Sequence, residues 1–97
     1  METYVILRRR GWSTSDELQE AAARSTAEGD RTPDDIRWIR SYVLSETDGS
    51  LGTVCVYQAS SPEAIRSHAQ RAGLPVDEII AVADTVIVRP DPVTAEA

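Results

Sequence analysis

The spacing of hydrophobic and polar residues divides the chain into stretches with two different periods. Alternation with period two, which is typical of β-strands, covers residues 4–10, 36–46, 51–59 and 77–88. A period near 3.6, which is typical of helices, covers residues 15–27 and 62–72. The resulting order, strand–helix–strand–strand–helix–strand, is the split βαβ or ferredoxin-like pattern. We therefore predict an α+β fold of βαββαβ order, with one antiparallel sheet and both helices on a single face of it.

Boundary residues support both predicted helices. Ser61 can act as the N-cap of the second helix, and Gly73 can adopt the left-handed conformation that ends it. Thr14 and Glu17 fit a capping box at the start of the first helix. Gly29 is predicted to end that first helix shortly after residue 27.

The lone histidine of the chain falls on the apolar side of its second helix. That side contains Ile65, His68, Ala69 and Ala72. Strand alternation puts Cys55 with Tyr57 on one face, and Trp38 with Arg40 and Tyr42 on one face. If the helix packs on the sheet through its apolar side, the imidazole is buried, and Tyr42, Tyr57 and Cys55 are its candidate partners.

The composition favours a small single domain that associates with itself. The chain has 97 residues and no Phe, so its core is built from aliphatic side chains and a few Trp and Tyr. We predict one domain over residues 1–88 and a flexible acidic tail over residues 89–97. Two helices on one side leave the other side of an aliphatic sheet bare, and we expect a homodimer to cover it.

The net charge and the cysteine content limit the partners and the cellular compartment that we expect for this protein. A net charge of −6 argues against nucleic acid as a partner, because such proteins need a basic face. A single cysteine suits a reducing compartment, and no apolar run is long enough to cross a bilayer, so we expect a cytoplasmic protein without membrane contact. The cluster Arg8-Arg9-Arg10 is either a solvated strand end or a corner that binds an anion.

Several short segments resemble one known family. They are Trp38-x-x-Ser41-Tyr42, the run CVYQA at 55–59, EAIRxHA at 63–69 and AGLP at 72–75. Together they are similar to a small bacterial family, first defined as a domain of unknown function and described as nickel-binding-like; the likeness extends over residues 4–88. The resemblance implies a ferredoxin-like fold, a dimer joined through its sheets, and binding of nickel or a similar divalent metal.

The candidate metal ligands are His68, Glu17 and Cys55, and each has an alternative structural role. Imidazole suits nickel and acid–base chemistry, but a buried histidine can simply hydrogen-bond within the core. A lone strand cysteine is either a soft ligand or a small buried apolar group. Glu17 lies in the first turn of its helix, where a carboxylate also stabilises the helix dipole. The sequence contains no spacing motif for a metal, so nickel rests on the resemblance.

Three functions follow as hypotheses. The preferred one is a dimeric protein that binds a divalent metal, nickel, through His68. The second is a cofactor-independent enzyme or a small-molecule binder that uses a pocket between helices and sheet, lined by Trp38, Tyr42, Tyr57, Cys55 and His68. The third is a structural or regulatory interaction module that works through the bare sheet face.

Overall fold

The computed structural model describes residues 1–92 and has the predicted order of elements. The elements are β1 (Glu2–Trp12), α1 (Ser15–Arg31), β2 (Ile36–Ser45), β3 (Leu51–Ala59), α2 (Pro62–Ala72) and β4 (Glu78–Ala81). Most of the tail predicted at residues 89–97 lies outside the described residues; within them, Asp91 pairs with Arg40.

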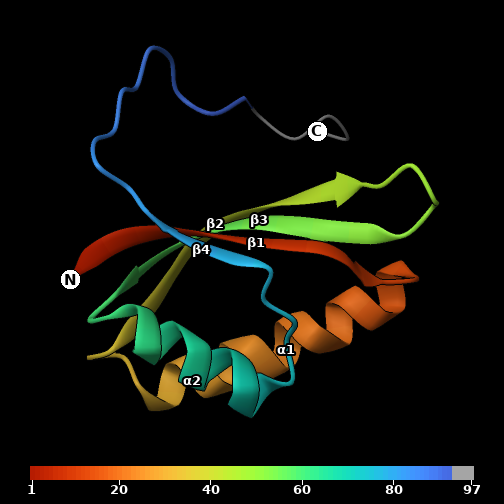
Figure 1. Cartoon of the computed structure of the whole chain (residues 1–97), viewed down its shortest axis with the longest axis horizontal. Helices are drawn as coiled ribbons and strands as arrows, with labels where there is room; N and C mark the ends of the chain where they lie inside the picture. Colours follow the sequence, from red (N-terminus) through yellow and green to blue (C-terminus); the bar gives the residue numbers. More distant parts are fainter. Residues whose placement is uncertain (93–97) are drawn as a thin grey trace.

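The four strands form one antiparallel sheet in the order β2-β3-β1-β4. Both helices lie on the same side of this sheet, and the segment after β4 passes on the other side (Figure 1). The core between the helices and the sheet is centred on Tyr4, Ile6, Ile36, Cys55, Tyr57, Ala59 and Ile65. The predicted ferredoxin-like α+β fold is therefore confirmed.

The capping residues act as predicted. The hydroxyl of Ser61 accepts the backbone N–H of Ala64, and Gly73 ends α2 in the left-handed conformation with φ 69°. At the start of α1, the Thr14 hydroxyl accepts the N–H of Glu17 at 3.2 Å. The Glu17 carboxylate accepts the N–H of Ser13, one residue before the N-cap, at 2.8 Å, so Thr14 satisfies an open donor of the first helical turn and Glu17 fixes the chain that enters it.

The predicted end of the first helix is wrong. Gly29 has no positive φ and continues α1, which reaches Arg31. The helix ends where the N–H of Thr32 bonds the carbonyl of Gly29 at 3.1 Å. Contacts outside the local sequence support this extra turn, because the Glu28 carboxylate pairs with Arg71 of α2 at 3.1 Å. This ion pair between the two helices stabilises the last turn of α1, although Gly29 alone predicts that the helix ends there.

The predicted last strand is too long. The alternating pattern covers residues 77–88, but β4 has only four residues and pairs with Tyr4–Leu7 of β1. The last bond along this edge joins the N–H of Val82 to the carbonyl of Thr3, and β1 itself begins at Glu2. Beyond that point β4 has no strand left to pair with, and Val86, Ile87 and Val88 are exposed.

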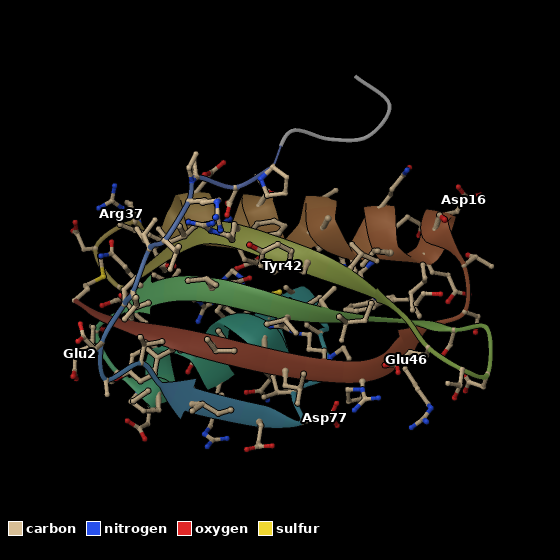
Figure 2. All side chains as sticks on the ribbon, turned by 90° about the horizontal axis from the view of Figure 1, so that it is seen from above. Glu2, Asp16, Arg37, Tyr42, Glu46 and Asp77 are labelled. Carbon is tan, nitrogen blue, oxygen red and sulfur yellow. The ribbon has the colours of Figure 1, made fainter. Side chains whose placement is uncertain are left out.

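A β-bulge in β2 overturns one predicted face. Pairing with β3 shifts between Trp38 and Arg40, so alternation is interrupted there. Trp38 lies opposite Tyr57 and Ser41 opposite Cys55, all on the side of the helices. Tyr42 lies on the opposite side and is half exposed, as Figure 2 shows in a view onto that face. The prediction that Trp38, Arg40 and Tyr42 share one face is therefore wrong.

The three consecutive arginines have different environments. Arg8 points between the sheet and the helices and is only 2% exposed, so this arginine is not part of a solvated strand end. Arg9 and Arg10 are exposed, and both contact the buried carboxylate of Glu46: Arg9 through a two-pronged guanidinium pair at 2.8 and 3.0 Å, and Arg10 through its backbone N–H at 3.0 Å. A side chain of the protein thus occupies the corner that could have held an anion.

These contacts predict a specific acid dependence of stability. The bonds from Arg9 and Arg10 lower the pKa of Glu46 from 4.5 to about 2. A carboxylate with a lowered pKa stabilises the fold above its unfolded pKa, and this contribution is lost as pH falls from about 4.5 toward 2. We expect Glu46→Gln to lower the melting temperature at pH 7 and to approach wild type near pH 2. Melting curves across this range, with exposed Glu20→Gln as control, test it; a pH-independent deficit would contradict it.

Candidate functional site

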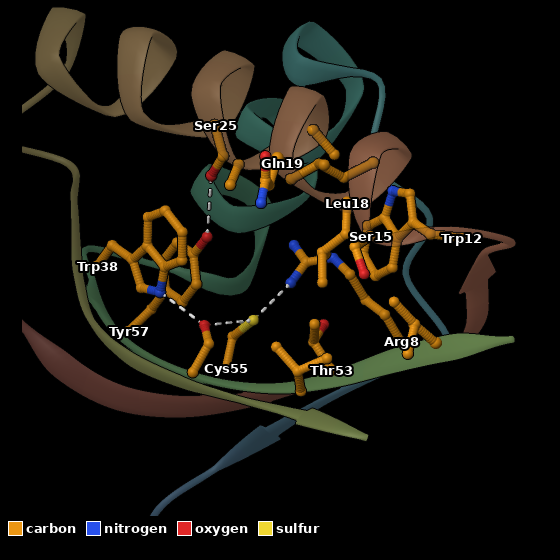
Figure 3. Close-up of a pocket in the computed structure, with 16 residues that line it drawn as sticks. Arg8, Trp12, Ser15, Leu18, Gln19, Ser25, Trp38, Thr53, Cys55 and Tyr57 are labelled. Carbon is orange, nitrogen blue, oxygen red and sulfur yellow. Dashed lines mark hydrogen bonds between the residues drawn. The ribbon is translucent and has the colours of Figure 1, made fainter. Parts of the chain in front are cut away.

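A cavity of about 500 Å³ lies between α1 and the helix-facing side of the sheet. We call it the α1–sheet cavity. Its walls are mostly apolar and include Trp12, Leu18, Ala21, Ala22, Trp38, Val43, Leu51, Tyr57 and Leu74. Four polar side chains from the strands also line it: Arg8, Ser41, Thr53 and Cys55 (Figure 3). Ala21 and Ala22 of α1 contribute only small side chains to the wall that this helix forms.

A line of hydrogen bonds crosses the floor of this cavity. The Trp38 indole donates to the Ser41 hydroxyl at 2.7 Å, and that hydroxyl donates to the Cys55 sulfur at 3.0 Å. Arg8 Nη1 donates to the same sulfur at 3.2 Å, and Arg8 Nε donates to the carbonyl of Pro75 at 2.8 Å. The bulge in β2 makes this arrangement possible, because it brings Ser41 onto the side of Cys55.

A second set of contacts surrounds His68. Its Nε2 lies 3.1 Å from the Ser25 hydroxyl, which in turn lies 3.2 Å from the Tyr57 hydroxyl. The Tyr57 ring stacks on Trp38 at a centroid distance of 6.2 Å and meets the imidazole edge-on at 5.8 Å. The predicted inward orientation of His68 is therefore observed. Tyr57 is connected to the imidazole by hydrogen bonds through the Ser25 hydroxyl of α1.

His68 is buried, and its ring carries one open nitrogen. Its Nδ1 has no hydrogen-bond partner among the described residues. Burial lowers the pKa of His68, Arg71 and Arg8 lower it further, and the Glu28 carboxylate acts in the opposite direction. The imidazole is thus held in its neutral form, which is the form that binds metals. Burial also raises the pKa of Tyr57, which keeps that side chain a phenol.

His68 lines a second cavity of about 320 Å³, which we call the His68 cavity. Ser25, Trp38 and Tyr57 border both cavities, so the two spaces meet at the stacked rings. Asp30, near the end of α1, also lines the His68 cavity and is exposed. One imidazole and one carboxylate, both nickel-type donors, therefore border the same space.

The three predicted metal ligands do not converge. Cys55 is bonded to Arg8 and Ser41 on the floor of the α1–sheet cavity. Glu17 is exposed in the first turn of α1, eight residues from the serine that contacts His68, which corresponds to about 12 Å along the helix axis. Within residues 1–92, no three side chains of His, Cys, Asp or Glu gather as a metal cluster. The His68–Glu17–Cys55 set therefore does not fit a nickel ion within one chain.

The predicted pocket residues are only partly brought together. Trp38, Tyr57 and Cys55 line the α1–sheet cavity, whereas Tyr42 lies on the other side of the sheet. Ser25 and Ser41 were not predicted as site residues, because a serine on a helix or a strand gives no distinctive signal in the sequence. Arg8 was predicted only as part of a basic cluster. Its place on the face of Tyr4 and Ile6 in the alternating pattern was the available sign that it is buried.

Comparison with known proteins identifies the family. The family described as nickel responsive protein, SCO4226-like, matches residues 4–82, which is most of the chain. The chain belongs to this family. A crystal structure of SCO4226 from Streptomyces coelicolor A3(2) is similar in fold, with a TM-score of 0.65 and 23% sequence identity over 87% of this chain and 99% of that one. No curated protein matches the chain.

The family assignment confirms the resemblance stated from the sequence. The segments that carried the resemblance include both His68 and the strand that holds Cys55 and Tyr57, so the family match covers the two cavities described above. No helix within residues 1–92 has the length and apolar character needed to span a membrane.

Proposed function

We propose that this protein binds nickel, and that His68 supplies a ligand through Nδ1. The observation that carries this proposal is a buried, neutral imidazole with an unpaired Nδ1, in a chain of a family described as nickel responsive. An unpaired buried nitrogen costs about 1–3 kcal/mol of stability, and a metal ion that binds this nitrogen recovers that cost.

The hydrogen bonds around the imidazole are compatible with this role. A metal at Nδ1 requires the proton on Nε2, which then donates to the Ser25 hydroxyl 3.1 Å away. Ser25 in turn can donate to Tyr57 at 3.2 Å. The serine therefore fixes the ring orientation and the protonated nitrogen, which is the usual task of a group that supports a metal-bound histidine.

Nickel needs further ligands besides the His68 imidazole. Asp30 borders the His68 cavity and is the carboxylate we propose as a second ligand. Nickel commonly takes more donors than these two, so we propose that water or a second copy of the chain completes the site. The open side of the sheet supports a homodimer: Tyr42 and Ile80 are about half exposed there, beside the partly exposed Val5 and Val56.

Isothermal titration of the tag-free protein with nickel chloride tests the proposal. We expect wild type to bind nickel. We expect His68→Ala and Asp30→Asn each to weaken binding by about tenfold or more, because the first removes the donor nitrogen and the second removes the negative charge and one carboxylate oxygen. Glu17→Gln and Cys55→Ser are matched controls that should bind like wild type. One nickel ion per two chains would support a shared site. Unchanged binding by His68→Ala would remove this histidine from the site and overturn the proposal.

A further inference from the structure

Arg8 is a buried charge that has no partner of opposite charge among the described residues. Its neighbours Arg9 and Arg10 are exposed and pair with the carboxylates of Glu46 and Asp48. Arg8 is only 2% exposed, yet it donates to a carbonyl and a thiol, and its Nη2 has no hydrogen-bond partner among the described residues. A buried guanidinium without an anion is costly, since burial removes the water that would stabilise its charge.

A second unpaired polar atom lies beside it. The Thr53 hydroxyl is buried and also has no partner among the described residues. Arg8 and Thr53 are directly opposite each other on β1 and β3, so their side chains leave the sheet together on the side of the helices. Both line the α1–sheet cavity, and Figure 3 shows the Arg8 guanidinium reaching into the space between the sheet and Leu18.

We propose that the α1–sheet cavity binds a small monocarboxylate with an apolar body, whose carboxylate accepts hydrogen bonds from Arg8 Nη2 and the Thr53 hydroxyl. The two unpaired donors match the two oxygens of a carboxylate, and one guanidinium balances one negative charge. The rest of the cavity, lined by Trp12, Leu18, Trp38 and alanines of α1, suits a hydrocarbon or an aromatic ring.

The size and access of the cavity agree with such a ligand. Its volume of about 500 Å³ falls in the range of small-molecule sites. Ser15 and Gln19 of α1 line it and are exposed, so the cavity reaches the protein surface along this helix. A dianion such as phosphate fits less well, because Arg8 is the one cationic side chain among the described residues that lines the cavity, and most of the other walls are apolar.

Titration calorimetry in the presence of EDTA tests the proposal independently of nickel. The probes are 3-phenylpropionate and octanoate, each compared with its neutral amide, and inorganic phosphate. We expect at least one acid to bind, its amide to bind about tenfold more weakly or worse, and phosphate not to bind. The two acids distinguish an aromatic from an aliphatic ligand body. Failure of both acids to bind, equal binding of acid and amide, or binding of phosphate alone would overturn the proposal.

Two variants locate the carboxylate. Arg8→Met keeps an apolar stem and should weaken acid binding by about tenfold or more while leaving amide binding unchanged. Thr53→Val keeps the shape of its side chain and should weaken acid binding by about fivefold. Arg66→Met, on the exposed side of α2, is the matched control and should bind like wild type. If Arg8→Met fails to fold by circular dichroism, Thr53→Val decides: unchanged acid binding by this variant would overturn the proposal.

Discussion

Ile6→Ala is expected to lower the free energy of unfolding by about 2–5 kcal/mol, the range found for large-to-small changes in well-packed cores. Ile6 is fully buried in a central strand, and its cross-strand neighbours are Cys55 and Ile79. Removing three carbon atoms there leaves a void that strands hydrogen-bonded on both sides cannot close. Because a small domain has a total stability of about 5–15 kcal/mol, the variant should be close to unfolding at 37 °C. Urea denaturation followed by circular dichroism measures the loss.

Ile87→Ala provides the matched control for this experiment. It makes the same chemical change at a side chain that is 76% exposed, so its expected effect is within about 0.5 kcal/mol. Equal losses in the two variants would contradict the core described here. They would also indicate that the apolar segment after β4 is covered by another molecule in solution.

Gly52→Ala is expected to destabilise the protein by about 1–3 kcal/mol, since it overfills a tight contact between strands. A Cβ atom at this position would lie 2.5 Å from the carbonyl oxygen of Arg8 and 2.5 Å from Glu46 Oε2. The backbone oxygen cannot move alone, so the two strands must separate or the Glu46 carboxylate must leave Arg9 and Arg10. Chemical denaturation at pH 7 measures this loss.

Gly29→Ala is the control that separates crowding from a general effect of replacing glycine. Gly29 lies inside α1, and a Cβ atom there would meet His68 at 3.6 Å, an ordinary contact. Alanine is favoured over glycine within a helix, so this variant should gain about 0.5–1 kcal/mol. If Gly52→Ala were as stable as wild type, the close approach of β3 to Arg8 would be wrong.

Local sequence signals were enough to predict the order of elements and the orientation of His68. The caps at Ser61, Gly73 and Thr14 and the apolar stripe of α2 depend on neighbours within a few residues, and all are confirmed. The lengths of the elements depend on distant partners. The α1 helix is extended by Glu28 pairing with α2, and β4 is shortened because β1 begins at Glu2. Neither the extra turn of α1 nor the early end of β4 can be predicted from the residues of that element alone.

The candidate site was predictable only in part for the same reason. Period-two alternation correctly put Cys55 and Tyr57 under the helices, but it failed for Tyr42 because one additional residue interrupts β2. The buried position of Arg8 followed the alternation, yet its charge favoured a surface interpretation. Which polar atoms remain unpaired, as at Thr53 and His68, depends on contacts between separate elements. This information exists only in the folded chain.

The bulge in β2 has a consequence for comparing members of this family. The bulge adds one residue between Trp38 and Ser41. A relative that is one residue shorter here would have strict alternation along β2. Its aromatic side chain and its serine, then two residues apart, would still both face the helices, whereas strict alternation over the three-residue spacing found here would turn one of them to the opposite face. An alignment that places no gap at the bulge would match cavity residues with solvent-facing residues of such a relative over half of the strand, so the gap belongs between Trp38 and Ser41.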